Sequence, residues 1–139
     1  MKVAVIGSRG LCVSDLGKFL PENTTEIVSG GARGVDTSAR EYALSHGIKL
    51  TEFLPEYTRF GRSAPLKRNI SIIEYADIVL AFWDGKSRGT KFVIDNCHRL
   101  GVEVRVYIMV GFVAKERVDG KLVLPEAVQI LKMKAGSGS

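Results

Sequence analysis

Short apolar runs, rich in β-branched residues, alternate along the chain with longer segments in which apolar positions recur at helical spacing. The short runs predict strands at 3–6, 26–28, 49–54, 78–82 and 103–110. The longer segments predict helices over 14–20, 35–45 and 65–75, and from 89 or 90 to 100. Boundary residues support these elements, because Ser14 suits a helix N-cap, Pro65 a first helical turn and Gly47 a left-handed C-cap.

Strands that alternate with helices build βαβ units, and these form a parallel sheet with helices on both faces. We therefore expect an α/β fold, namely a single-domain, Rossmann-like, doubly wound sheet over 1–134 with strand order 3-2-1-4-5. Asp119-Gly120, between two apolar-alternating arms, predicts a C-terminal β-hairpin extension. Residues 125–132 are expected to form a last short helix, and the low-complexity segment 135–139 a flexible tail.

Composition narrows the class of protein. With 139 residues, 45% hydrophobic and 25% charged, the chain resembles a globular domain rather than a disordered segment. No apolar run approaches the ~18 residues of a membrane span, and the apolar start is too short for a signal peptide, so we expect a cytoplasmic protein without membrane contact. The net charge of +5 favours anionic partners, and two cysteines beside two histidines match no zinc-site pattern, so no metal is expected.

Three glycine-containing loops follow the first, second and fourth predicted strands. They read Gly7-Ser8-Arg9, Ser29-Gly30-Gly31-Ala32-Arg33-Gly34 and Asp84-Gly85-Lys86-Ser87-Arg88-Gly89-Thr90. In an open parallel sheet such loops lie at the carboxyl edge, where ligands bind beside the switch in strand order. Glycines let backbone N–H groups approach an anion, and the helix N-termini that follow add partial positive charge. The loops therefore predict a site for a small phosphate-bearing ligand, although they match neither a Walker A motif nor a GxGxxG fingerprint.

Residues next to these loops extend the candidate site. Asp36, in the first turn of the second helix, either stabilises that helix N-terminus or accepts hydrogen bonds from a ribose hydroxyl. Asp84 ends the fourth strand and is expected to point into the crevice. The candidate ligand-binding residues are Gly7, Ser8, Arg9, Ser29, Gly30, Gly31, Arg33, Gly34, Asp36, Arg68, Asn69, Asp84, Ser87, Gly89 and Thr90.

A basic and aromatic stretch precedes Arg68. It contains Arg59, Arg62 and Lys67, interleaved with Tyr57 and Phe60. Side chains of these types clamp phosphates and stack on bases. The stretch therefore predicts weak, salt-sensitive binding of single-stranded nucleic acid.

Five motifs occur in a characteristic order along residues 1 to about 110. They are Gly7-Ser8-Arg9, Val28-Ser29-Gly30-Gly31-Ala32-Arg33-Gly34-Val35-Asp36, Arg68-Asn69, Ala76-Asp77 and Ser87-x-Gly89-Thr90. In this order they resemble the SLOG superfamily of Rossmann-like proteins, named for Smf/DprA and LOG, and especially its small members related to YspA and YpsA. The resemblance implies a parallel Rossmann variant that binds a nucleotide or nucleotide-derived ligand at the strand ends, and it implies a homodimer.

Two branches of that superfamily imply more specific activities. The LOG branch hydrolyses nucleoside monophosphates with an arginine, matched here by Arg68, and a glutamate whose position is occupied here by Val93. LOG-like phosphoribohydrolase activity is therefore disfavoured, and Arg68 and Asp84 are the catalytic candidates that remain. The DprA branch binds single-stranded DNA, which makes nucleic-acid binding the alternative function. The function expected first is binding of a nucleotide-type ligand, by a sensor or a nucleotide-processing protein.

Overall fold

The structure is a computed structural model that describes residues 1–32, 34–108 and 129–133. The elements in chain order are β1 (Lys2–Gly7), the 3₁₀ turn η1 (Leu16–Lys18), β2 (Glu26–Ser29), α1 (Val35–His46), β3 (Lys49–Glu52), α2 (Tyr57–Phe60), the 3₁₀ turn η2 (Gly61–Ser63), α3 (Ala64–Tyr75), β4 (Ile78–Trp83), α4 (Arg88–Leu100), β5 (Glu103–Ile108) and β6 (Gln129–Met133). Among the described residues, no helix is long and apolar enough to cross a membrane.

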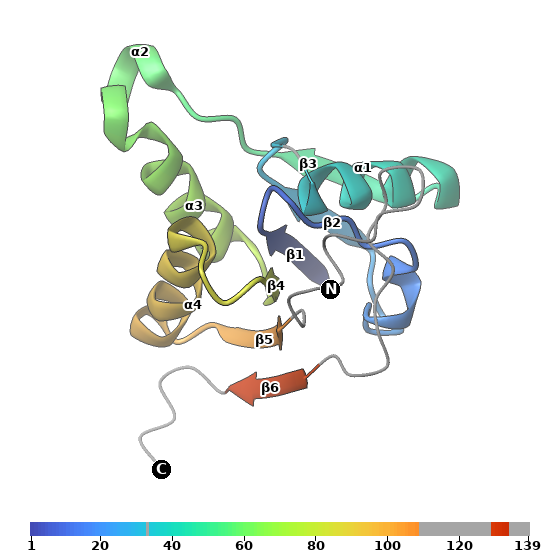
Figure 1. The fold of residues 1–139 in the computed structure, drawn as a ribbon. Coiled ribbons are helices and arrows are strands. Elements are labelled where there is room, and N and C mark those ends of the chain that lie inside the picture. The colour runs from blue at the N-terminus through green and yellow to red at the C-terminus, as the bar shows by residue number, and fades with distance from the viewer. Residues whose placement is uncertain (33, 109–128, 134–139) are drawn as a thin grey trace.

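The strands form one sheet in the order β3-β2-β1-β4-β5-β6. β1 to β5 are parallel, which confirms the predicted α/β class and the order 3-2-1-4-5. β6 pairs antiparallel with β5 at the outer edge, whereas the Asp119-Gly120 turn of the predicted hairpin lies outside the described residues. α1 covers one face of the sheet, and α3 and α4 lie together on the other (Figure 1).

Successive side chains along the central strands point to opposite faces of the sheet, so the core has two layers. Along β4, Ile78, Leu80 and Phe82 belong to the layer beneath α1 and η1, whereas Val79 and Ala81 belong to the layer beneath α3 and α4. All five side chains are at most 1% exposed. Because helices cover both faces of the parallel part, these strands are apolar on both sides. The ends of the strands are therefore the places where this sheet can meet a ligand.

The three long helices are confirmed, and their boundaries agree with the predicted ones to within one or two residues. α1 ends at Gly47 and α4 at Gly101, with φ of +65° and +75°, a left-handed conformation that favours glycine. Pro65 occupies the first turn of α3, where its missing N–H costs no helical hydrogen bond.

The helix expected over 14–20 was wrong, because this segment forms only the 3₁₀ turn η1. Its apolar residues Leu16 and Phe19 are three positions apart, so one tight turn aligns them. That turn already buries Leu16 and places the Phe19 ring against Phe82, with centroids 5.2 Å apart. Gly17 also packs closely on α1, since a Cβ there would lie 2.6 Å from the Tyr42 hydroxyl.

Two other local predictions were wrong. Residues 56–64, between the predicted strand 49–54 and the predicted helix 65–75, were assigned no element, but they form α2 and η2, which lead into α3 and stand away from the sheet (Figure 1). The helix expected over 125–132 is overturned by β6, because Gln129–Met133 pairs with the edge of β5. That pairing satisfies backbone groups that an isolated short helix would leave without partners. Residues 125–128 lie outside the described residues.

Candidate functional site

The three glycine loops meet at one cavity of about 470 Å³ at the carboxyl ends of β1 and β4. Its lining residues are Ile6, Gly7, Arg9, Gly10, Gly30, Ala32, Asp36, Pro65, Leu66, Arg68, Asn69, Ile72, Asp84, Ser87, Gly89 and Thr90. β1 and β4 flank the switch in strand order, which is where open α/β sheets bind their ligands. Most of the residues predicted from the sequence are thus brought together in this cavity.

Arg68 joins α3 to the loop after β2. Its Nη1 donates to the carbonyl oxygens of Gly30 (2.7 Å) and Phe53 (3.4 Å), and its Nε donates to Asn69 Oδ1 (2.8 Å). A Cβ on Gly30 would lie 2.5 Å from Nη1, so this close approach depends on glycine. Burial lowers the pKa of Arg68 while Asp36 opposes the shift, and an arginine still keeps its proton. The guanidinium is therefore held in the cavity wall as a permanent positive charge.

Asp36 is the buried carboxylate of the cavity, with 8% of its surface exposed. Its Oδ2 accepts a hydrogen bond from the Ala32 N–H at 3.0 Å, as expected of a group that stabilises the start of α1. Burial raises the pKa of Asp36, although that hydrogen bond and the charges of Arg68 and Arg9 act in the opposite direction. The hydroxyl-binding interpretation of Asp36 stays a prediction.

The N-terminus of α4 opens directly onto the cavity. Ser87 is its N-cap, and Gly89 and Thr90 line the cavity from the first turn. The first N–H groups of an α-helix have no acceptor within the helix and carry partial positive charge. A Cβ on Gly89 would meet nothing within 4 Å, so the space in front of this turn is open. Together with Arg68 across the cavity, this turn can hold a phosphate group.

Asp84 lines the cavity and also shapes its own loop. Its Oδ1 accepts the N–H groups of Lys86 and Ser87, both at 2.8 Å, and its own N–H donates to the buried Ser8 Oγ at 3.3 Å. Burial acts to raise the pKa of Asp84, but the hydrogen bonds from Ser87, Lys86 and Ser8 outweigh it and lower the pKa. Ser8 thus ties the loop after β1 to the loop after β4, and a catalytic role for Asp84 stays a prediction.

Replacing Asp84 with alanine is expected to destabilise the protein by about 1 kcal/mol at neutral pH, because two N–H groups lose their acceptor. The lowered pKa means that this stability is present above the usual carboxyl range and is lost as the pH falls through the folded-state value. Urea denaturation at several pH values checks this. The matched control is Asp95→Ala, which removes an exposed carboxylate paired with Lys91. If Asp84→Ala is still less stable than the wild type at a pH below the range in which carboxylates titrate, the loss does not come from the ionised Asp84 carboxylate, and this prediction is contradicted.

Other predicted residues support the loops without lining this cavity. Ser29 is fully buried, and its Oγ accepts the Gly31 N–H at 3.3 Å. Gly34 has φ +72°, and a Cβ there would lie 2.4 Å from the Arg9 carbonyl oxygen. It therefore allows the loops after β1 and β2 to touch. Arg33 lies outside the described residues.

The apolar part of the lining was missed by the sequence analysis. Pro65 and Leu66 lie about one helical turn before Arg68 and Asn69. That spacing places them on neighbouring parts of the same helix face, so it was a usable signal. Ile6 and Ile72 carry no such signal, because they also belong to the buried core layer beneath α3 and α4.

A second hollow, of about 450 Å³, adjoins the cavity. It shares the walls formed by Arg9, Gly30, Ala32 and Arg68, and its remaining walls are Gly31, Leu54, Pro55 and Tyr57. Among the predicted ligand-binding residues that the structure describes, Gly31 alone lines this hollow and not the cavity.

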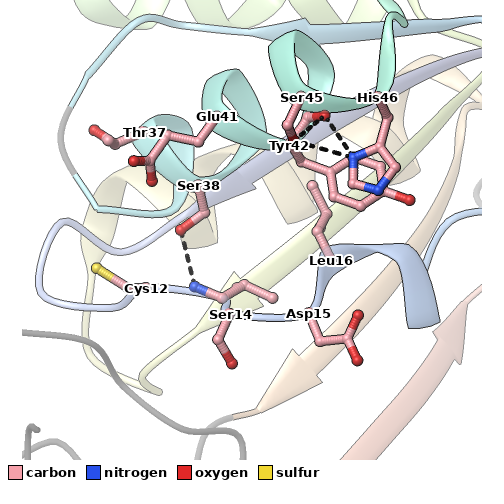
Figure 2. Close-up of a pocket in the computed structure, with 11 residues that line it drawn as sticks. Cys12, Ser14, Asp15, Leu16, Thr37, Ser38, Glu41, Tyr42, Ser45 and His46 are labelled. Atoms are coloured by element: carbon pink, nitrogen blue, oxygen red, sulfur yellow. Dashed lines mark hydrogen bonds between the residues drawn. The ribbon is translucent and has the colours of Figure 1, made fainter.

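A separate pocket of about 440 Å³ lies between η1 and α1, away from the glycine loops (Figure 2). There the Tyr42 and His46 rings stack with centroids 3.9 Å apart. The pocket is lined by the carboxylates of Asp15 and Glu41 and by none of the predicted ligand-binding residues, so its charge does not favour an anion. Across the described ranges, no group of three or more His, Cys, Asp or Glu side chains is placed to hold a metal ion.

Val93, which the sequence resemblance matched to the LOG glutamate, is fully buried in the core layer that contains Ile72 and Ile73. A carboxylate at this position would lie among apolar side chains rather than in the cavity. The structure thus supplies a physical reason for an apolar residue here.

Replacing Val93 with glutamate is expected to destabilise the protein by about 1–3 kcal/mol or more, because a carboxyl group would be buried without a partner. We also expect no release of adenine from AMP, since catalytic groups need a supporting shell. Urea denaturation and chromatography of the reaction mixture check the two parts. Phe92→Glu, at a half-buried neighbouring position, is the control for the added charge. A stable Val93→Glu protein that releases adenine at about 1 per second would contradict this account.

Comparisons with known proteins agree with the fold. No family model matches the chain. The X-ray structure of TM1055, a Northeast Structural Genomics Consortium target, superposes with a TM-score of 0.59 at 20% identity and covers 88% of this chain and 89% of that chain. The Gene 61 protein of Mycobacterium phage D29 is 33% identical over 84 residues, which is 56% of this chain and 67% of that protein. The chain therefore belongs to the family of this phage Gene 61 protein.

Proposed function

We propose that the protein binds a nucleotide or nucleotide-derived, phosphate-bearing ligand in the cavity between the ends of β1 and β4, as a SLOG-type sensor or nucleotide-processing protein. One observation carries the proposal: Arg9, Arg68 and the open first turn of α4 all face a single cavity. Guanidinium groups and helix N-termini are both well suited to phosphate. The cavity also falls within the size range of small-molecule sites, about 300–1,000 Å³.

Different residues of the cavity bind different parts of the proposed ligand. Arg68 and the N–H groups of Gly89 and Thr90 hold the phosphate from two sides, and Arg9 adds positive charge at the end of β1. Asp36, in the first turn of α1, lines the same cavity, and its carboxylate accepts a hydrogen bond from a ribose hydroxyl.

Isothermal titration with inorganic phosphate, ribose 5-phosphate, AMP, ADP and ADP-ribose tests the proposal. We expect binding by the wild type and a large loss in Gly30→Ala, because the added methyl group would displace the Arg68 guanidinium. Gly47→Ala is the control, since a Cβ there meets nothing within 4 Å and Gly47 lies at the far end of α1. Absence of binding by all five compounds at millimolar concentration, or equal affinity of wild type and Gly30→Ala, would overturn the proposal.

A second candidate function, binding of single-stranded nucleic acid, is favoured by one feature of the arm formed by α2 and η2. The Phe60 ring lies 4.9 Å from the Arg59 guanidinium carbon and 5.7 Å from Lys67 Nζ, so an aromatic face is flanked by cations. Oligonucleotide binding along several phosphates loses affinity steeply with salt, with a slope of about −0.7 per phosphate contact. Tight binding that survives 200 mM salt would rank this function above the mononucleotide site.

A further inference from the structure

The hollow beside the cavity differs from it in chemical character. Its outer wall is formed by Leu54, Pro55 and Tyr57, whereas the wall it shares with the cavity contains Arg9 and Arg68. An apolar and aromatic surface thus meets the proposed phosphate site at the Arg68 guanidinium. This inference rests on the proposed function, since it concerns the remaining part of the same ligand.

The two large side chains of this outer wall are largely exposed. Leu54 is 64% exposed and Tyr57 is 58% exposed. Both residues follow β3, and Pro55 lies between them in the segment that leads into α2. Leu54 and Tyr57 line the same concave hollow, so their exposed apolar surface is contiguous there. A contiguous apolar surface in a concave site is well suited to a ligand.

Tyr57 is also coupled to the phosphate side of the site. Its phenol is close enough to Arg68 to interact with the guanidinium electrostatically. Arg68 in turn donates a hydrogen bond to the Gly30 carbonyl oxygen, in the floor that the two spaces share. A ligand that places a charged group against Arg68 therefore places its neighbouring atoms next to Tyr57.

Phe60, on the same short helix as Tyr57, shows that this arrangement is specific to one side of α2. Phe60 lines a neighbouring groove of about 340 Å³ with Arg59 and Lys67. That groove shares Leu54 and Arg68 with the hollow, but Phe60 itself lines neither the cavity nor the hollow. The structure thus separates two aromatic residues that the sequence placed in one basic stretch. Tyr57 belongs to the small-ligand site, and Phe60 belongs to the outer surface.

We propose that the hollow is a base subsite, in which a nucleobase packs on Leu54 and stacks on the Tyr57 ring while the phosphate of the same molecule occupies the adjoining cavity. Aromatic side chains stack on every base, because each base has a flat π-face. The ligand class is therefore a nucleotide that carries a base, rather than a sugar phosphate or an inorganic anion. Selectivity among bases is not expected from stacking alone.

Isothermal titration of AMP and of ribose 5-phosphate against the same variants tests this subsite. In the wild type, AMP should bind about tenfold or more tightly than ribose 5-phosphate, which is the gain expected from one stacked base. Tyr57→Ala should remove most of that gain, so that the affinity for AMP falls much more than the affinity for ribose 5-phosphate. Tyr57→Phe should retain the gain, because it keeps the ring, and Phe60→Ala should behave like the wild type.

The outcomes separate the subsite from the proposed function. Equal affinities for AMP and ribose 5-phosphate, or an unchanged AMP affinity in Tyr57→Ala, would overturn the base subsite while the phosphate site stands. Failure of both compounds to bind the wild type would overturn both. Thermal denaturation of each variant checks folding, and the 58% exposure of Tyr57 predicts little change in its stability.

Discussion

Arg68→Ala is expected to lower the affinity for ribose 5-phosphate by about ten- to hundredfold. A hydrogen bond to a charged group contributes about 1.5–3 kcal/mol, and 1.4 kcal/mol corresponds to tenfold in affinity. The guanidinium also donates to the Gly30 and Phe53 carbonyl oxygens, so we expect an additional loss of about 1 kcal/mol in unfolding free energy. Isothermal titration and urea denaturation measure the two effects separately.

Lys67→Ala is the matched control for this prediction. Lys67 precedes Arg68 on α3 and carries the same charge, but it lines the groove of Phe60 rather than the cavity. Its removal should change ribose 5-phosphate affinity far less than that of Arg68. The ribose 5-phosphate affinity of Arg68→Lys should lie between those of the wild type and Arg68→Ala, because a lysine retains the charge and loses the planar fork of donors. Equal losses in Arg68→Ala and Lys67→Ala would show that only net charge matters.

Gly34→Ala is expected to cause the largest loss of stability, about 3 kcal/mol or more. Its φ of +72° is strained for a residue with a Cβ, and the added carbon would lie 2.4 Å and 2.7 Å from the carbonyl oxygens of Arg9 and Leu11. Those atoms belong to the backbone and cannot rotate away as a side chain could. Relief of the clash would move the loop after β1, and with it Arg9, away from its place in the cavity.

Gly47→Ala separates the effect of backbone strain from the effect of the steric clash. Gly47 has a similar φ of +65° but nothing within 4 Å of an added Cβ. It should lose only the conformational term of about 1–2 kcal/mol. Urea denaturation of the two variants measures the difference. If both variants lose the same free energy, then the close contact between the loops after β1 and β2 is absent from the folded protein.

The parallel sheet and most of the cavity could be predicted from the sequence because both depend on local patterns. Apolar runs such as Ile78–Trp83 and helix-ending glycines such as Gly101 place the elements, and right-handed crossovers then determine the strand order. The glycine loops fall at strand ends, so their convergence follows from the topology. Gly30, Gly89 and Thr90 were identified in this way.

Other features depend on tertiary contacts that no local pattern carries. Tyr57 and Phe60 are three positions apart, yet they line different hollows, since the direction of α2 is determined by how it meets α3. Asp84 lines the cavity, but its second task, in which one oxygen accepts two backbone N–H groups of its own loop, depends on the local loop conformation. The segment with η1 was predicted to be a longer helix because its apolar residues have helical spacing. A single 3₁₀ turn is enough to place Leu16 and Phe19 against the core.

The central claim, that a phosphate ligand occupies the cavity at the ends of β1 and β4, is tested most directly by a ¹H–¹⁵N NMR titration with ribose 5-phosphate. The amide signals of Gly30, Gly89 and Thr90 should shift together and saturate at the same ligand concentration, because these residues line one cavity. The amides of Ser45 and His46, in the pocket between η1 and α1, should not move. Shifts confined to that second pocket, or no saturable shift at Gly89 and Thr90, would contradict the account.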